Sequence, residues 1–225
     1  MAESLDDIVE SKESKGFIRK AAKIGFKVGM AAATTALSVS LVGSLGIWVG
    51  ASFAAGGAIA DLARGKSLYE TTSKALTTYS AVNAVIHPMV WLGDMTFPLI
   101  SNNTISGFLL RGAYASTVYN AAFVGSFRAG EHLVDNYLNP KGMVKYVANG
   151  FPKKWRDIGL LFSPFYTLAA NGITTLPIFG YPMPTFAVGA LPVGFALDYF
   201  DAFRQKAKQA ASSYMPKYSP AMQPA

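Results

Sequence analysis

The sequence predicts an all-α fold: a polytopic membrane helix bundle with four core spans and an N-terminal hydrophobic hairpin. Of the 225 residues, 51% are hydrophobic and only 15% are charged, whereas soluble domains carry about 25% charged residues. The stretch from Ile158 to Leu197 has no charged side chain over 40 residues, which is about twice the length of a membrane span. The 21 glycines are typical of helices that pack closely in lipid.

The expected spans follow from four uncharged stretches, which in chain order are Val28–Ala60, Ala75–Gly93, Gly112–Phe127 and Ile158–Leu197. The third extends back to about Ile105, and Pro98 with the polar residues 101–104 predicts a loop before it. The fourth is long enough for two helices. Its prolines between Pro177 and Pro184 predict a tight turn, because proline interrupts a helix interior.

The first stretch is long for one span and short for two, and the basic residues decide between these readings. If the chain turns at Gly43–Gly46, 19 of the 20 Lys and Arg lie on one side of the membrane and only Arg111 on the other. Such an imbalance is typical of cytoplasmic loops. We therefore expect a plasma-membrane protein with both termini in the cytoplasm and with Lys27 reaching the interface. A re-entrant hairpin would give the same distribution.

The chain accordingly divides into four parts. Residues 1–27 form a basic amphipathic segment, which lies on an anionic lipid surface or extends the first span. Residues 28–64 form the membrane hairpin, and residues 74–204 form the four-helix core. Residues 205–225 form a cytoplasmic, partly disordered tail that is rich in proline near its end.

Composition excludes several classes of function. The absence of cysteine excludes disulfides and thiolate metal sites, and only two histidines are present, so we expect no cofactor and no metal. The basic residues flank apolar stretches rather than forming an aromatic-rich platform, so we expect no nucleic-acid partner. No Ser–His pair, no paired aspartates in adjacent spans and no HExxH motif favour an enzyme.

The four later spans read as two copies of one helical pair. The first member of each pair carries an aromatic–Ser step, at Tyr79–Ser80 and Phe162–Ser163. The second member ends in glycine, aromatic and charged residues, at Gly125–Arg128 and Gly194–Tyr199. Because each copy has an even number of spans, the two-helix repeats are expected to be parallel, a pattern found in transporters.

At these residues the chain resembles the L-alanine exporter family of small four-helix membrane proteins, over about residues 70–208. The likeness rests on the helix that bears Asn83, on Gly125–Arg128, on Phe162–Ser163–Pro164 and on Leu197–Asp198–Tyr199. The added N-terminal residues and a long loop expected between Arg128 and Asp157 depart from the family. The resemblance implies proton-coupled export of a small amino acid such as L-alanine. The alternative is a structural or interaction protein of the membrane without transport activity.

A solute site in such a bundle needs polar side chains that face inward from several spans. The candidates for substrate binding are Ser80, Asn83, Asn120, Ser163, Tyr166 and Asn171. Asn83 and Asn120 lie well inside their spans, where two amides could pair or could hold a substrate carboxylate and amine. Hydrogen bonding between helices alone would also explain each residue taken singly, and is common for Asn, Ser and Thr in membranes.

Three further residues are candidates for a proton relay or a charge pair. His87 precedes Pro88 within a span, and its ordinary pKa near 6.5 suits a relay. It could instead donate to a carbonyl that the proline leaves free. Arg111 needs a partner if it lies inside the membrane, and Asp94 is the obvious one, unless Arg111 reaches the interface.

A cluster of charges marks the expected cytoplasmic ends of the core, at Arg128, Glu131, Asp198, Asp201 and Arg204. The spacing of three residues suits ion pairs within a helix, and the cluster could anchor the surface or gate the cytoplasmic side. The expected partners are the lipid bilayer and a small amino acid. Whether the chain forms a homo-oligomer stays open.

Overall fold

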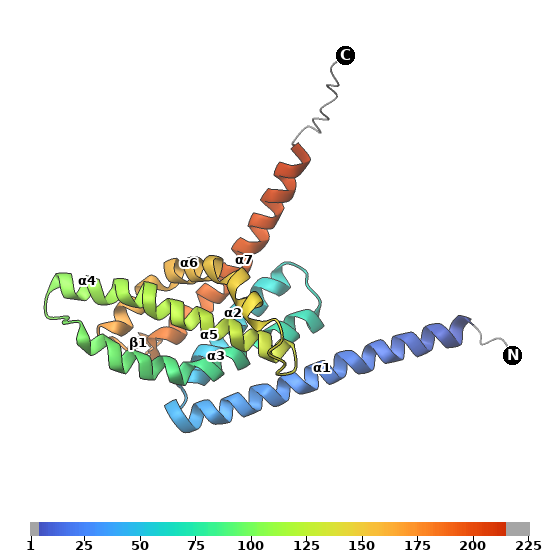
Figure 1. The fold of residues 1–225 in the computed structure, drawn as a ribbon, viewed down its shortest axis with the longest axis horizontal. Coiled ribbons are helices and arrows are strands. Elements are labelled where there is room, and N and C mark those ends of the chain that lie inside the picture. The colour runs from blue at the N-terminus through green and yellow to red at the C-terminus, as the bar shows by residue number, and fades with distance from the viewer. Residues whose placement is uncertain (1–4, 215–225) are drawn as a thin grey trace, which may run out of the picture.

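The computed structural model describes the backbone of residues 5–214 and the side chains of residues 15–199, Phe203 and Lys206. Its helices and strands confirm the all-α class apart from one short hairpin (Figure 1). In chain order they are α1 (Leu5–Val42), α2 (Leu45–Ala63), α3 (Leu68–Thr96), η1 (Phe97–Leu99), α4 (Ile105–Tyr114), η2 (Ala115–Tyr119), α5 (Asn120–Asp135), α6 (Met143–Ala170), β1 (Thr175–Ile178), β2 (Tyr181–Pro184) and α7 (Thr185–Tyr214). Residues 215–225, on which part of the tail prediction falls, lie outside the described residues.

The expected N-terminal hairpin is present, with its turn at Gly43 and Ser44. Gly43 has a φ of 64°, a left-handed conformation that glycine adopts without strain. The basic segment before the hairpin is the beginning of α1 and no separate element. In the described part of the chain, two helices are long and apolar enough to cross a membrane, Lys15–Val42 and Leu45–Ala63.

Five helices close into a ring, in which α2, α3, α5, α6 and α7 each pack on the next and α7 packs back on α2. The helix α1 lies outside this ring, mainly against α3. The helix α2, which the sequence predicts as part of the hairpin, packs between α3 and α7 and completes the ring. Glycines allow its approach to α7: a Cβ on Gly56 would lie 2.2 Å from the carbonyl oxygen of Leu191, and one on Gly194 would lie 2.7 Å from that of Phe53.

Aromatic side chains fill the centre of the ring. The ring of Phe53 on α2 stacks on Phe162 of α6, with 5.7 Å between centroids, and on Phe123 of α5, with 6.2 Å. These rings are buried together with apolar side chains of α3 and α7. Stacked aromatic pairs add to the packing energy of the helices, so Phe53 joins α2 to the opposite side of the bundle.

Two connections differ from expectation. The long loop expected between Arg128 and Asp157 is mostly helical, because α5 continues to Asp135 and α6 already begins at Met143 with Pro152 inside it. The turn expected at Pro177–Pro184 is in the right place but is an antiparallel hairpin of β1 and β2. Phe179 and Gly180 at its tip have φ values of 50° and 83°, as two-residue hairpin turns require.

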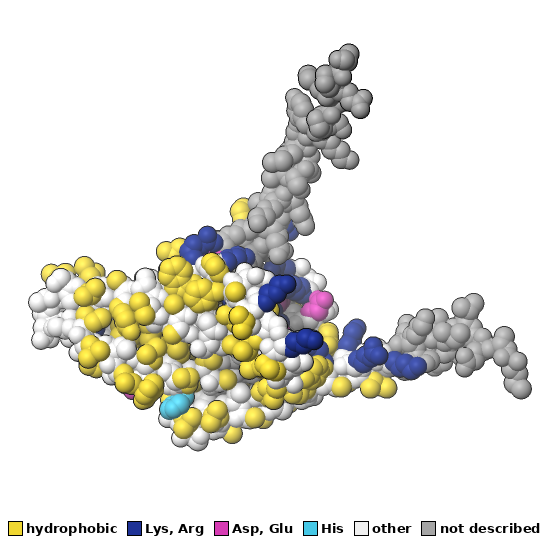
Figure 2. Space-filling view, in the orientation of Figure 1, with side chains coloured by type: hydrophobic (Ala, Val, Ile, Leu, Met, Phe, Trp, Pro, Cys, Tyr) yellow, Lys and Arg dark blue, Asp and Glu magenta, His cyan; other side chains and the backbone are white. Residues whose placement is uncertain are grey.

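The two ends of the bundle differ in charge. One end carries the connections at residues 43–44, 97–104 and 171–184, none of which contains Lys or Arg. The other end carries the connections at 64–67 and 136–142, and α1 and α7 project beyond the bundle (Figure 1). Lys and Arg side chains gather around the bases of these two projections, while apolar side chains cover much of the remaining face (Figure 2).

Candidate functional site

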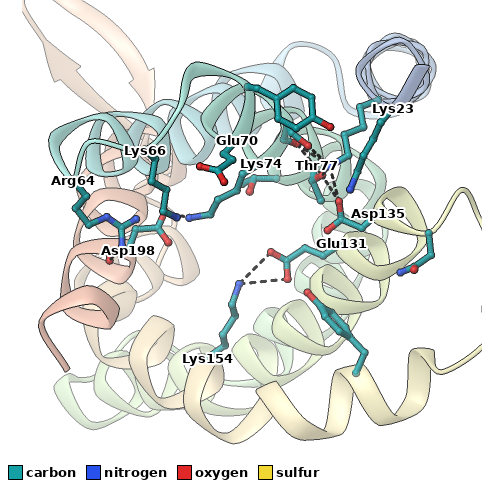
Figure 3. Close-up of a pocket in the computed structure, with 16 residues that line it drawn as sticks. Lys23, Arg64, Lys66, Glu70, Lys74, Thr77, Glu131, Asp135, Lys154 and Asp198 are labelled. Carbon is teal, nitrogen blue, oxygen red and sulfur yellow. Dashed lines mark hydrogen bonds and ion pairs between the residues drawn. The ribbon is translucent and has the colours of Figure 1, made fainter. Parts of the chain in front are cut away.

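A vestibule of about 780 Å³ opens at the charged end of the bundle. Six basic and four acidic side chains line it, contributed by α1, the α2–α3 connection, α3, α5, α6 and α7. Figure 3 shows these side chains arranged around an open space rather than along one wall. The vestibule therefore offers partners for both signs of charge, with an excess of two bases.

One wall of the vestibule is organised by Asp61 at the end of α2. Its side chain is only 1% exposed, yet it pairs with Arg64, with Lys66 at 3.0 Å and with Lys74 at 3.4 Å. Lys74 on α3 also contacts Asp198 on α7, with Nζ 2.5 Å from Oδ2. These contacts join the ends of three helices. A buried carboxylate of this kind is tolerated only because several cations surround it.

A second wall holds Lys27, which the sequence predicts to reach outward to the membrane interface but which is buried among protein groups. Its Nζ donates to the carbonyl oxygen of Ser73 at 3.0 Å, to Ser73 Oγ at 2.8 Å and to Thr77 Oγ1 at 2.6 Å. It also lies 2.5 Å from Oδ1 of Asp135 on α5. The lysine therefore fastens α1 to both α3 and α5.

The third wall is built around Glu131 on α5. Lys154 of α6 lies 3.1 Å from Oε1, and Arg128, one turn earlier, lies 3.4 Å from Oε2. The predicted spacing of Arg128 and Glu131 thus gives an ion pair, but a buried one. The guanidinium lies over the ring of Tyr146 at 4.1 Å, and burial raises the pKa of Tyr146 to about 12. Asp201 and Arg204, predicted for the same cluster, have side chains outside the described residues.

Below the vestibule lies a smaller cavity of about 60 Å³, here called the neck cavity. It shares with the vestibule the side chains of Lys74, Glu131, Lys154 and Asp198. Two facing ion pairs, Lys74–Asp198 and Lys154–Glu131, therefore form its rim (Figure 3). The rest of its lining includes three phenylalanines, Phe53, Phe123 and Phe127, and the charged side chains of Lys153 and Asp157.

A third hollow, the inner cavity of about 30 Å³, lies beyond two of these phenylalanines. Phe53 and Phe123 line both it and the neck cavity. Side chains from all five helices of the ring enclose it, among them Tyr119 and Tyr166. Vestibule, neck cavity and inner cavity thus form a row inside the bundle, and stacked aromatic rings separate the last two.

Of the six predicted substrate-binding residues, four lie in the contact of α4, η2 and α5 with α6. The hydroxyl of Tyr166 donates to Asn120 Oδ1 at 3.1 Å, and Asn120 Nδ2 donates to the carbonyl oxygen of Trp155 at 2.7 Å. Ser163 accepts from Ser116 at 3.1 Å. Asn171 donates to backbone oxygens of α4 and α6. These bonds hold helices together, and Tyr166 also lines the inner cavity.

Asn83 lies elsewhere, in the contact between α3 and α2. Its Nδ2 donates to the carbonyl oxygen of Tyr79 at 3.0 Å, while its Oδ1 is buried without a hydrogen-bond partner, as is the hydroxyl of Ser80. Gly46 and Gly50 of α2 lie against the amide, because a Cβ on either would come within 2.8 Å of it. Asn83 and Asn120 therefore do not form the predicted pair.

The predicted relay residues are also separate. Arg111 does not pair with Asp94: its Nε donates to the carbonyl oxygen of Ile100 at 2.5 Å and its Nη1 to that of Ala170 at 3.1 Å. It thus joins three segments near the end of the bundle whose connections lack Lys and Arg, here called the uncharged end. Asp94 is exposed. His87 is partly buried. Its Nδ1 has no hydrogen-bond partner, so that atom does not donate to the backbone carbonyl that Pro88 leaves free.

Sequence reasoning missed Asp61, Lys74 and Lys154, which contribute most to the walls and the rim. A signal exists for the first: Asp61 ends an apolar stretch, and Arg64 follows at the spacing of an ion pair within a helix.

Comparisons with protein-family models, curated proteins and solved structures find no match for the chain. The likeness to L-alanine exporters therefore stays a prediction.

Proposed function

We propose that this chain is a multi-pass membrane transporter that exports a small amino acid such as L-alanine. The row of vestibule, neck cavity and inner cavity inside the helix ring carries the proposal. A transporter needs a solute site near the middle of a bundle and access to it from one side at a time. Here the solute enters from the vestibule, and the stacked rings of Phe53 and Phe123 close the way beyond the neck cavity.

The distribution of charge supports a placement of the bundle in the membrane. The connections at the uncharged end have no Lys or Arg, so this end faces outward and the vestibule faces the cytoplasm. The 19 residues of α2 span about 28 Å at about 1.5 Å per residue, close to the hydrocarbon thickness. Exposed apolar side chains such as Leu37, Leu41 and Trp91 then face lipid.

The balance of charges supports the substrate class. A small amino acid carries one positive and one negative group, and the vestibule offers both kinds of partner. Coupling to protons is part of the proposal, with His87 as the candidate group inside α3. Its unpartnered Nδ1 leaves it free to take part in proton transfer.

The absence of cysteine allows a direct test by blocking the row of cavities. Thr78 lines both the vestibule and the neck cavity, whereas Glu70 lines only the vestibule and is exposed. We expect Thr78→Cys, labelled with a bulky maleimide, to lose most release of labelled alanine from loaded vesicles. Glu70→Cys with the same label should keep it.

Equal release by the two labelled proteins would contradict a path through the neck cavity. If loaded vesicles with the protein release small amino acids no faster than loaded vesicles without it, over a panel of such amino acids, the result would favour the structural or interaction protein. The long exposed apolar flank of α1 outside the ring is the feature that suits this second function.

A further inference from the structure

We propose that the neck cavity binds its substrate as a zwitterion, with Lys154 holding the carboxylate and Asp198 holding the ammonium group. This inference rests on the proposed transport of a small amino acid and assigns the site and the recognition. Both side chains belong to the rim shared by vestibule and neck cavity. In Figure 3 they approach the open space from different sides.

These two residues are chosen because each can turn to a ligand without leaving the charge of its former ion-pair partner unpaired. If Lys154 releases Glu131, that carboxylate keeps Arg128 at 3.4 Å. A buried charge without any partner would be unfavourable, and this arrangement avoids it. The carboxylate of Glu131 is 11% exposed, whereas Lys154 is 32% exposed, so the mobile partner is the lysine.

The second ion pair of the rim is built in the same way. If Asp198 releases Lys74, the lysine keeps Asp61 at 3.4 Å. Lys74 is 39% exposed and Asp198 is 22% exposed, so exposure does not decide between them; Asp198 is the member that can hold an ammonium group because it is the carboxylate of the pair. Each rim pair therefore has one member with a second counter-ion, and the other member can exchange partners without leaving a charge unpaired. A ligand with both charges can replace both partners at once.

The shape of the neck cavity limits the rest of the ligand. Its volume of about 60 Å³ has room for about four to six water-sized groups, at about 10–15 Å³ for each. That matches the heavy atoms of alanine or a similarly small amino acid. Besides the rim residues and the charged side chains of Lys153 and Asp157, the wall includes Phe53, Phe123 and Phe127, which suit a small apolar side chain.

Glycine keeps the room that the rim needs. A Cβ on Gly57 of α2 would lie 2.8 Å from Oδ2 of Asp198, so a larger residue there would displace the carboxylate. Any other residue at this place would therefore disturb the proposed ammonium site before it disturbed the packing of the helices.

Competition against labelled alanine transport in reconstituted vesicles tests the inference. Glycine should compete well, whereas lactate, which lacks the ammonium, and alaninamide, which lacks the carboxylate, should compete at least tenfold more weakly. In Lys154→Met the preference for alanine over alaninamide should disappear. In Asp198→Asn the preference for alanine over lactate should disappear. Glu70→Gln, a change at the outer part of the vestibule, should keep both preferences.

The pattern of selectivity separates recognition from folding, because a purely structural loss would lower all transport without changing preferences. Lys154→Arg, which keeps the charge, should retain the preference over alaninamide. If wild-type protein transports alanine but lactate and alaninamide compete as well as glycine, or if both variants keep wild-type preferences, the inference is overturned while transport stands. If wild-type protein transports and binds no amino acid, the proposed function itself is overturned, and this inference with it.

Discussion

Lys27 and Asp135 form the ion pair that fastens α1 to the helix ring, and its two members differ in burial. The side chain of Lys27 is 2% exposed, whereas that of Asp135 is 42% exposed. The ammonium also contacts Ser73 and Thr77. Removing one member or the other should therefore lower the free energy of unfolding by different amounts.

Asp135→Asn leaves a buried ammonium with only neutral acceptors. Breaking a buried ion pair in this way costs about 3–5 kcal/mol, and because the oxygens of Ser73 and Thr77 remain, we expect about 3 kcal/mol. Lys27→Met leaves a carboxylate that water can reach. It loses hydrogen bonds to a charged group, about 1.5–3 kcal/mol, but avoids burying a charge and keeps an apolar side chain of similar length. We therefore expect about 1 kcal/mol.

The measurement is unfolding of the purified protein in mixed micelles, followed by the fluorescence of its three tryptophans. The double variant should resemble Lys27→Met, because no ammonium then remains to be left unpaired. Glu70→Gln, a matched change at an exposed carboxylate, should stay within about 0.5 kcal/mol of wild type. Equal losses for the two single variants, or a larger loss for Lys27→Met, would refute this reasoning.

Two further pairs of variants test the packing of the ring by the same unfolding assay. Gly56→Ala brings a methyl group to 2.2 Å from the backbone of Leu191 and should lower the free energy of unfolding by about 1–3 kcal/mol. Gly57→Ala meets only the movable side chain of Asp198 and should lower it by less. Similar losses for the two variants would contradict this. Asn120→Ala removes two bonds between helices, about 0.6 kcal/mol each on average in membranes. Asn83→Ala, whose Oδ1 has no partner, should cost less, and a larger loss would show that Asn83 has an essential contact.

Most helices and turns could be predicted because their signals are local. The turn after Gly43, the start of α4 at Ile105 and the reversal between Pro177 and Pro184 all follow from glycine, proline and apolar runs. The region from Asp135 to Asp157 misled the prediction because its charges and Pro152 are typical of loops. In the structure Asp135 and Lys154, two of these charges, line the vestibule.

The candidate site could not be predicted from polar residues inside the spans. Asn83 and Asn120 are far from one another in the chain, and which face of each helix turns inward depends on how α2 packs. The sequence places α2 in a hairpin with α1, but not between α3 and α7. Only that position turns Phe53 into the centre and brings Asp61 beside Lys74.

The same packing explains how the bundle can hold many charges without becoming rigid at its rim. Ion pairs in a protein interior resist opening when each charge has one partner, because separation leaves both unpaired. Glu131 and Lys74 each have a second counter-ion, so loss of one partner leaves neither isolated. Asp61, Lys74 and Glu131 hold α2, α3 and α5 in place, while Lys154 and Asp198 are free to exchange partners because Glu131 and Lys74 keep their second counter-ions. A stable frame and an adaptable binding site can therefore occupy the same end of the helix ring.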